Sequence, residues 1–493
     1  MEETLFDEIL QEIFTRLQSS SSLPTHELVP LVSKRWLRLY RASKTSMSLR
    51  ISPFDSSVIT HLPSILHNHP SLSSLSFIFD SKFPTPIRSA SDDSAAEANF
   101  NAYLISIVSS RCINLEKLRL LVSPVSSSSL LPLSASSSSS LTSLSLELVR
   151  PVSFDWVASF KSLKDLSIDV SSRTTSDFES GSNRNTNPDD AVVEESGLES
   201  ISLTGIQSDD TGVTWLWKRC RKVKKLSLKS CGTIGETELF GLCLKNLEEI
   251  ELRTCRSIAD VVLLKVSEVC ESLKSLLIYD GGNRDGLDHF MNNSKCNDTL
   301  KSLDLRLPMD LIDDHLVSLA ENFRSLSTLR LASCYFVTGL SLKVLALSFS
   351  SSLEELSLLS CDAVERESGL LATLGQDLRR LRKLELPFNE WLSDKELVSM
   401  LASCGGLVEL NLRGCKSLTG SVLVSLNKSC VKLRTLDVAS CGLIEGGDVE
   451  AFVVKSQRLK KIVVDEKKIT EEAMKWASSK LIDVVAVDSD LPR

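Results

Sequence analysis

The stretch Leu433-Arg-Thr-Leu-Asp-Val-Ala-Ser-Cys441 decides the fold of this 493-residue chain. It places apolar residues at its first, fourth and sixth positions and a cysteine at its ninth. The same frame recurs through the second half of the chain, where its first position falls at 326, 353, 381, 407, 433 and 459. A fixed period of this length predicts a stacked repeat, in which each unit packs on its neighbours.

The frame resembles the leucine-rich repeat, L-x-x-L-x-L-x-x-N/C. Between motifs the apolar spacing becomes helical, as in residues 261–269, so that each unit is predicted to be a strand followed by a helix. We therefore predict an α/β solenoid of horseshoe type over residues 46–493, with parallel strands inside and helices outside. A degenerate first strand is expected at 46–52, two of whose residues precede Leu75 and Phe77 by 26 positions, and a closing strand at 481–487.

Thirteen cysteines occupy two positions of this repeat. Six end the strand motif, and seven lie three or four residues before the next motif. In such positions a thiol is expected to be a small buried hydrophobe and a weak donor. There is no C-x-x-C pair, so we expect neither a structural zinc site nor a catalytic cysteine. Reduced thiols are typical of the cytoplasm and the nucleus.

Composition and motifs narrow the possible functions further. A net charge of −8 argues against a general nucleic-acid binder. The first ten residues are acidic and unlike a signal peptide, and no stretch is long and apolar enough for a transmembrane helix. We expect a soluble protein of the cytoplasm or nucleus. Phosphate-loop and metalloprotease signatures are missing, so no enzyme activity, cofactor or metal is expected.

Three polar stretches interrupt the period, near 81–100, 122–140 and 171–196. Serine, asparagine and acidic residues dominate them, and such compositions bury too little apolar surface to become ordered. We favour unordered insertions over the alternative, docking or phosphorylation loops.

Residues 1–45 do not follow the repeat. One helix face is predicted from the apolar residues Leu5, Ile9, Leu10, Ile13, Phe14 and Leu17. Thr4 and Asp7 form a plausible capping box for this helix, which is expected to end at the serines from 19 onward. A second helical stretch spans 28–39, with a kink at Pro30. So short a segment should pack on the solenoid or on a partner.

The first helix reads Leu5-Phe-Asp-Glu-Ile-Leu-Gln-Glu-Ile-Phe-Thr-Arg-Leu17, and Leu31-Val-Ser-Lys-Arg-Trp36 follows. This segment resembles an F-box, with Phe6 in place of a proline and Ser33 in place of a cysteine. Placed before these repeats, it resembles the layout of plant-type F-box/leucine-rich-repeat proteins. The resemblance implies a non-catalytic, substrate-recognition subunit of a Skp–cullin–F-box ubiquitin ligase, which recruits targets for ubiquitination and proteasomal degradation.

The resemblance also implies partners and contacts. The partners would be a Skp-type adaptor, through it a cullin–RING ligase, and an unknown protein substrate, without nucleic acid or membrane. The adaptor contacts would be Leu5, Phe6, Ile9, Leu10, Ile13, Phe14, Leu17 and Val32. Trp36 and Leu39 are expected to lock the helices together or onto the first repeat.

A substrate surface is predicted from strand geometry, because residues that alternate with the core leucines point outward. Its candidate residues are Lys229, Arg253, Leu277, Tyr279, Arg306, Arg330, Leu359 and Arg413. The cations suit a carboxylate or phosphate, and a patch centred on Tyr279 suits a protein anchor. The alternative is a solvated surface of mixed charge, in which Arg253 pairs with Glu251 or Glu249.

Two other functions remain open. One is a leucine-rich-repeat interaction scaffold in which the N-terminal helices form a cap, with the Leu5–Leu17 face packed on the repeats. The other is a small-molecule co-receptor that resembles the plant auxin and jasmonate receptors.

Overall fold

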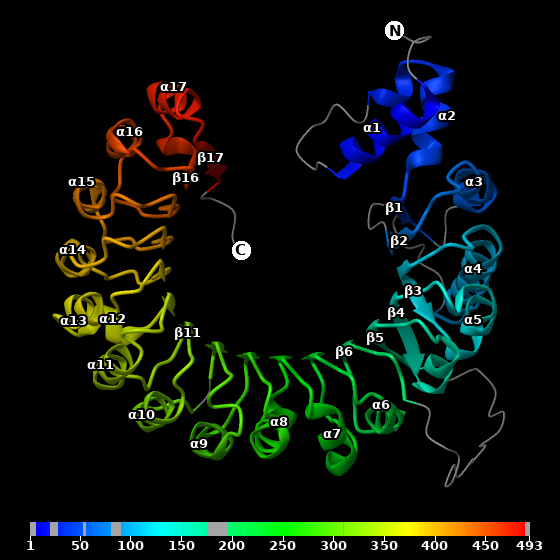
Figure 1. The fold of residues 1–493 in the computed structure, drawn as a ribbon, viewed down its shortest axis with the longest axis horizontal. Coiled ribbons are helices and arrows are strands. Elements are labelled where there is room, and N and C mark those ends of the chain that lie inside the picture. The colour runs from blue at the N-terminus through cyan, green and yellow to red at the C-terminus, as the bar shows by residue number, and fades with distance from the viewer. Residues whose placement is uncertain are drawn as a thin grey trace. The chain divides into compact units, whose positions relative to one another are not determined.

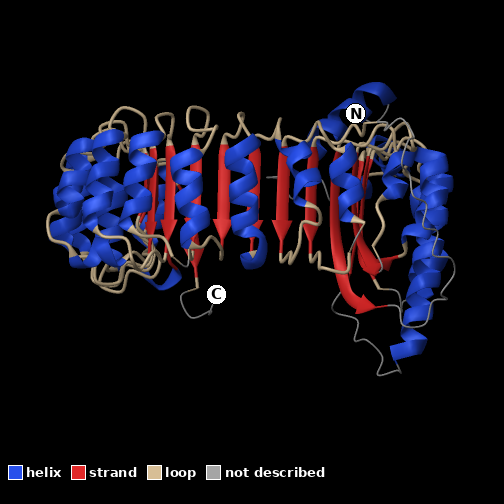
Figure 2. Cartoon of the chain, turned by 90° about the horizontal axis from the view of Figure 1, so that it is seen from below, coloured by secondary structure: helices blue, strands red, loops and turns tan. Residues whose placement is uncertain are grey.

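The computed structural model describes residues 6–19, 28–52, 56–79, 90–150, 152–174, 195–210, 212–308 and 310–488. The chain divides into two compact units, Met1–Cys243 and Leu244–Arg493. Within each unit parallel strands alternate with helices, and the strands lie on one side of the layer and the helices on the other (Figures 1 and 2). The predicted α/β repeat solenoid is therefore confirmed.

The first unit begins with α1 (Asp7–Ser19), the short 3-10 helix η2 (Val29–Leu31) and α2 (Lys34–Ser43). Its strands are β1 (Ser46–Ile51), β2 (Ser74–Phe79), β3 (Lys117–Val125), β4 (Ser143–Arg150), β5 (Asp165–Thr174), β6 (Ser200–Thr204) and β7 (Lys225–Lys229). Its further helices are α3 (Ser56–His67), α4 (Ala90–Arg111), η3 (Ser127–Leu130), α5 (Leu131–Ser137), η4 (Asp155–Ser159), α6 (Val213–Arg219) and α7 (Thr237–Leu244). Each strand pairs in parallel with the next one along the chain.

The second unit repeats the same arrangement. Its strands are β8 (Glu249–Arg253), β9 (Ser275–Tyr279), β10 (Ser302–Arg306), β11 (Thr328–Ala332), β12 (Glu355–Leu359), β13 (Lys383–Glu385), β14 (Glu409–Asn411), β15 (Thr435–Asp437), β16 (Lys461–Asp465) and β17 (Asp483–Val487). Its helices are α8 (Arg256–Val269), α9 (Arg284–Asn293), α10 (Asp313–Asn322), α11 (Gly339–Ser348), α12 (Asp362–Arg366), α13 (Leu370–Asp377), α14 (Asp394–Leu401), α15 (Gly420–Ser429), α16 (Gly446–Lys455), η5 (Glu466–Lys468) and α17 (Glu471–Ser479). The predicted closing strand is confirmed by β17, which pairs with β16.

The motif residues stack on their equivalents in neighbouring repeats. Leu436 pairs in register with Leu410, and Leu410 with Leu384, and all three are buried. Val438 and Cys441 of the same motif are buried as well. Because consecutive side chains of a strand point to opposite faces, this register places the core residues on one side of the sheet and leaves the positions between them outward.

The eighth motif position turns the chain out of each strand. In the second unit its backbone is left-handed at Thr254, Asp280, Leu307, Ser333, Ser360, Phe388, Gly414 and Ser440. This conformation costs L-residues on the order of 1–2 kcal/mol each. Its recurrence at one motif position sends every following loop to the same edge, where the strands end and the helices begin.

Two details of the first unit differ from prediction. β1 pairs Met47 with Leu75 and Leu49 with Phe77, a register two residues away from the expected one. A shift of two keeps each side chain on its original face, so the core pattern is unchanged.

The interpretation of 122–140 as an unordered insertion is wrong. β3 continues to Val125, and η3 and α5 follow, with Leu130 and Leu133 completely buried. Two leucines among serines are enough because neighbouring elements cover them, whereas Leu131 between them is exposed. Residues 90–100 likewise belong to α4 rather than to an insertion, while 81–89 and 175–194 lie outside the described residues.

Among the helices of the described residues, none is both long and apolar enough to cross a membrane.

Candidate functional site

The N-terminal helices have a small core of their own. It consists of Leu10, Phe14, Val29, Leu39 and Tyr40, with Leu17 and Trp36 packed against it. The ring of Phe14 lies 5.4 Å from that of Trp36 and 6.0 Å from that of Tyr40. Of the two roles predicted for Trp36 and Leu39, the structure shows the first, which is to hold these helices together.

Local hydrogen bonds fix the geometry of these helices. Ser33 is the N-cap of α2, where its hydroxyl accepts a hydrogen bond from the backbone N–H of Trp36 at 3.2 Å. Pro30 lies in η2 ahead of this cap, so the predicted kink within one long helix is wrong. Arg35 joins α2 to α1 through an ion pair with Asp7 at 2.6 Å. The predicted capping residue Thr4 lies outside the described residues.

The outer side of these helices is apolar and exposed. On α1 and directly before it, Phe6 is 73% exposed, and Ile9 and Ile13 are exposed as well. Their spacing of three and four residues places them on one helix face. The η2 segment adds Leu28, Leu31 and Val32, of which Leu31 is 78% exposed. We call these six residues the helical apolar surface.

The structure divides the predicted adaptor contacts into two groups. Phe6, Ile9, Ile13 and Val32 belong to the helical apolar surface. Leu10 and Phe14 are instead core residues with exposures of 2% and 1%, Leu17 packs against them, and Leu5 lies outside the described residues. The prediction that Leu10 and Phe14 present themselves to a partner is therefore wrong for the free chain, because α2 already covers them.

Sequence reasoning missed Leu28 and Leu31 as candidate contacts. Pro30 between them carries the signal, because it interrupts regular helix and leaves its apolar neighbours in a short 3-10 turn. Within this turn Val29 enters the core, and Leu28 and Leu31 on either side of it stay exposed.

Three of the four predicted cations of the second unit, Arg253, Arg306 and Arg330, are paired within the chain, and the fourth is Arg413. Arg253 forms an ion pair with Glu251, as the solvated alternative foresaw. Arg306 donates two hydrogen bonds of 2.8 Å to Asp304, and this contact raises the pKa of Arg306 above its usual value. Arg330 pairs with Glu355 at 3.2 Å. An incoming anion would have to compete with these carboxylates.

The structure does bring Tyr279 between two of these arginines. In the strand register Tyr279 lies opposite Arg253 on β8 and opposite Arg306 on β10, and its side chain is half-buried. Leu277 lies opposite Asp304, whereas Leu359 and Arg413 belong to later repeats. Lys229 is exposed on β7 of the first unit. The Tyr279-centred patch is thus a narrow apolar strip between ion pairs.

All thirteen cysteines are free and buried, as predicted. Several thiols donate to a carbonyl of the preceding repeat, such as Cys415 to Leu386 at 3.0 Å and Cys441 to Leu412 at 3.1 Å. Burial raises the pKa of both thiols to about 12. Cys415 and Cys441 therefore stay protonated at physiological pH and act as structural donors to the backbone.

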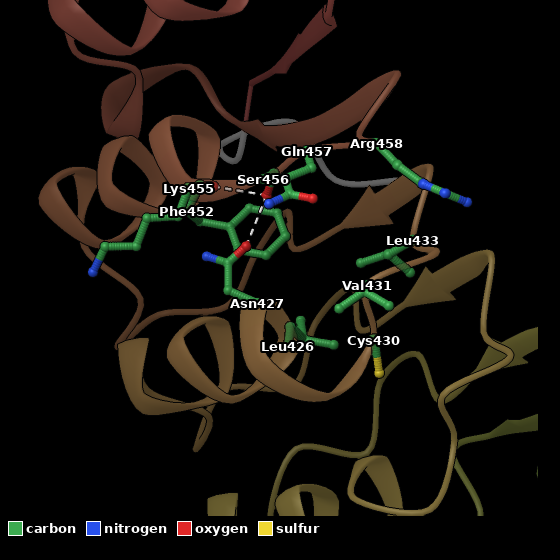
Figure 3. A pocket seen from close by; sticks show the side chains of 10 residues that line it. All are labelled: Leu426, Asn427, Cys430, Val431, Leu433, Phe452, Lys455, Ser456, Gln457 and Arg458. Carbon is green, nitrogen blue, oxygen red and sulfur yellow. Dashed lines mark hydrogen bonds between the residues drawn. The ribbon is translucent and has the colours of Figure 1, made fainter.

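A small cavity lies between the C-terminal ends of α15 and α16 (Figure 3). Its volume is about 70 Å³, and a hydrogen bond of 3.0 Å from Ser456 to Asn427 lies at its wall. Small-molecule sites usually measure about 300–1,000 Å³. This cavity is too small for such a ligand.

No family model matches the sequence. Among solved structures, the chain is similar to one in the crystal structure of the yeast Rad7 and Elc1 complex, with 16% identity, a TM-score of 0.46 and coverage of 98% of this chain and 94% of that one. It is also similar to a chain of the Toll–Spatzle complex of Drosophila, with 14% identity, a TM-score of 0.35 and coverage of 85% and 53%. At these values the likeness supports no inference about activity or partners, and the repeat fold rests on the register described above.

Proposed function

We propose that this protein is the substrate-recognition subunit of a Skp–cullin–F-box ubiquitin ligase, which recruits proteins for ubiquitination and proteasomal degradation. The observation that carries the proposal is the helical apolar surface, which stays exposed although the same helices have a folded core. Phe6, Ile9 and Ile13 share one helix face, and contiguous exposed apolar residues mark interaction sites. The F-box resemblance of residues 5–36 supplies the identity of the partner, a Skp-type adaptor.

The proposed contacts follow from exposure. Phe6, Ile9 and Ile13 of the first helix and Leu28, Leu31 and Val32 of the turn would enter the adaptor, while Leu10 and Phe14 support them from behind. A rigid helical pair that presents preordered side chains loses little conformational entropy on binding, which favours affinity.

The repeats would hold the target. Catalysis would then belong to the ubiquitin-carrying enzyme of the assembly, and this chain would act by proximity, since holding two reactants together is itself worth several kcal/mol of barrier. The chain itself would be no enzyme and would need no cofactor.

The test is adaptor binding by the full chain with Ile9→Asp and Ile13→Asp together. Both residues are exposed, so the helices should stay folded, which circular dichroism checks. Two charges placed in the core of an interface should weaken binding of a purified Skp adaptor about 100-fold or more. The matched control is Leu264→Asp with Val424→Asp, two exposed apolar residues of the repeats. Unchanged adaptor affinity in the first variant, or no binding by the wild type, would contradict the proposal.

The cap alternative makes the opposite prediction. It requires the Leu5–Leu17 face to pack on the repeats, whereas Phe6, Ile9 and Ile13 are exposed. If the wild type binds no Skp adaptor and removal of residues 1–45 lowers the melting temperature of the repeats, the scaffold function is favoured instead.

A further inference from the structure

A second exposed apolar surface lies on the repeats of the second unit. Tyr335, Phe336 and Leu340 follow β11, and Phe388 and Trp391 follow β13. All five are exposed, and Trp391 and Leu340 reach 76% and 72%. We call these five residues the aromatic rim. Four of them lie in the loops that lead into α11 and α14, at the edge of the sheet where the strands end, and Leu340 is the second residue of α11.

The two loops belong to one surface. β11 pairs with β12 and β12 with β13, and neighbouring strands lie about 4.8 Å apart, so the loops leave the sheet roughly 10 Å from each other. The segment around α12 joins them. Glu367 accepts a hydrogen bond from the backbone N–H of Gly339, and Glu365 accepts one from that of Trp391 at 3.0 Å.

The repeat fold does not require aromatic side chains here. Phe336 and Trp391 occupy the same position of the repeat, ten residues after its first leucine. Four other repeats of this unit carry the polar residues Ser257, Asn283, Asp310 and Ser417 there, and three carry the smaller or aliphatic residues Ala363, Leu443 and Ile469. Exposed aromatic residues at a position that accepts serine contribute no core packing, and hot spots of interfaces are enriched in such side chains.

The surroundings of the aromatic rim are strongly acidic. Residues 307–314, 335–340, 361–369 and 388–396 contain the carboxylates Asp310, Asp313, Asp314, Asp362, Glu365, Glu367, Glu390, Asp394 and Glu396. The same four ranges contain two cations, Arg366 and Lys395. Lys416, just outside them, adds a third cation, because it pairs with Glu390 at 2.7 Å. Nine carboxylates against three cations leave a net charge of −6. Several carboxylates bind neutral N–H and O–H groups, as Asp394 binds Thr419, and this leaves their charge in place.

We infer that the aromatic rim is a docking surface for a basic linear segment of another protein, with two bulky apolar anchors flanked by lysine or arginine. Trp391 and Phe336 would hold the anchors, and the surrounding carboxylates would attract the flanking cations. The inference is independent of adaptor binding, because it concerns other residues and a different readout.

The negative charge around the aromatic rim argues against three other partners: a second copy of this chain, a nucleic acid and an anionic membrane. A symmetric contact between two copies would bring two surfaces of the same negative charge together, since an isologous interface repeats the same patch on both sides. Nucleic acids and anionic membranes are repelled for the same reason. A basic peptide with apolar anchors would be stabilised both by contact with the aromatic rim and by attraction to the surrounding carboxylates.

The test uses a defined probe with the full chain. A fluorescein-labelled 12-residue peptide with two tryptophans flanked by lysines is titrated by anisotropy, and its counterpart has glutamate for every lysine. The lysine peptide should bind, and its affinity should fall at least about 10-fold between 50 and 500 mM salt, because screening weakens exposed charge pairs. The glutamate peptide should not bind.

Variants assign the binding to the aromatic rim. Phe336→Ser with Trp391→Ser should weaken binding at least about 10-fold, as expected when two anchors are lost. The matched control, Val424→Ser with Trp476→Ser, removes exposed apolar residues elsewhere in the same unit and should change affinity less than about 2-fold. No binding, equal binding of both peptides, or equal loss in both variants would overturn the inference. The inference would also be overturned if sedimentation showed that the free chain is a dimer and that Trp391→Ser dissociates this dimer.

Discussion

The N-terminal helices and the repeats differ in how completely their apolar residues are buried. In the repeats the strand leucines, such as Leu410 and Leu436, are buried between neighbouring units. In the helices Leu10 and Phe14 are equally buried, yet Ile9 and Ile13 beside them are exposed. A solenoid unit has a neighbour on each side, whereas a pair of short helices can cover only one face of each. Apolar residues left over after a core has formed are therefore the informative ones, and the aromatic rim is the second such case.

The largest effect that tests this comparison is expected at Phe14. Phe14→Ala should cost the N-terminal helices about 3–5 kcal/mol, because it removes a ring packed on Trp36 and Tyr40. Ile13→Ala, one residue away and exposed, should cost less than about 1 kcal/mol. Hydrogen exchange of the amides in α1 and α2 measures both, with the amides of the repeats as internal control. Equal loss of protection in the two variants would refute the division into core and surface.

A smaller effect is expected where one repeat caps the next. Asp313 accepts hydrogen bonds from the N–H and hydroxyl of Thr338, at 2.8 and 2.6 Å, and from the hydroxyl of Ser341 at 2.6 Å. Asp313→Ala should destabilise this part of the second unit by about 1–3 kcal/mol at pH 7, because the hydrogen bonds from Thr338 and Ser341 to the carboxylate are lost. Asp310→Ala, an exposed carboxylate of the same loop, is the control.

The effect of Asp313→Ala on stability should depend on pH. Burial opposes the charge of Asp313, but the hydrogen bonds from Ser341 and Thr338 outweigh it and lower the pKa below its usual value. A lowered pKa stabilises the fold above the pKa of the unfolded chain, and this stability is lost as pH falls through the folded pKa. The difference in melting temperature between wild type and Asp313→Ala should therefore shrink below about pH 4. A difference that stays constant down to pH 3 would contradict this account.

The smallest effect is expected on the sheet surface. Arg330 and Glu355 are both partly exposed, so Arg330→Gln should change stability by less than about 1 kcal/mol. A double-mutant cycle with Glu355→Gln measures the pair by thermal unfolding at low and high salt. A coupling energy above about 2 kcal/mol would mean that the outward face is more rigid than a solvated one.

Much of the fold could be predicted because the same sequence motif recurs many times along the chain. The positions of strands and helices, the closing strand and the burial of the cysteines follow from one frame, since a residue type repeated in register indicates the same environment each time. The prediction failed at 122–140, where composition was averaged over a stretch in which Leu130 and Leu133 are buried. Only the packing of neighbouring elements decided that those leucines have a core to enter.

The sequence by itself determined Leu433, Leu436, Val438 and Cys441 as core and Thr435 and Asp437 between them as surface, because strand alternation is local. It also determined that α1 has an apolar side. Only the tertiary structure decided that Leu10 and Phe14 are covered and Ile9 and Ile13 are not, that Arg306 is neutralised by Asp304, and that Phe336 and Trp391 belong to one acidic edge. Periodicity fixes which way a side chain points relative to its own element, whereas exposure and pairing depend on neighbours that are distant in the chain.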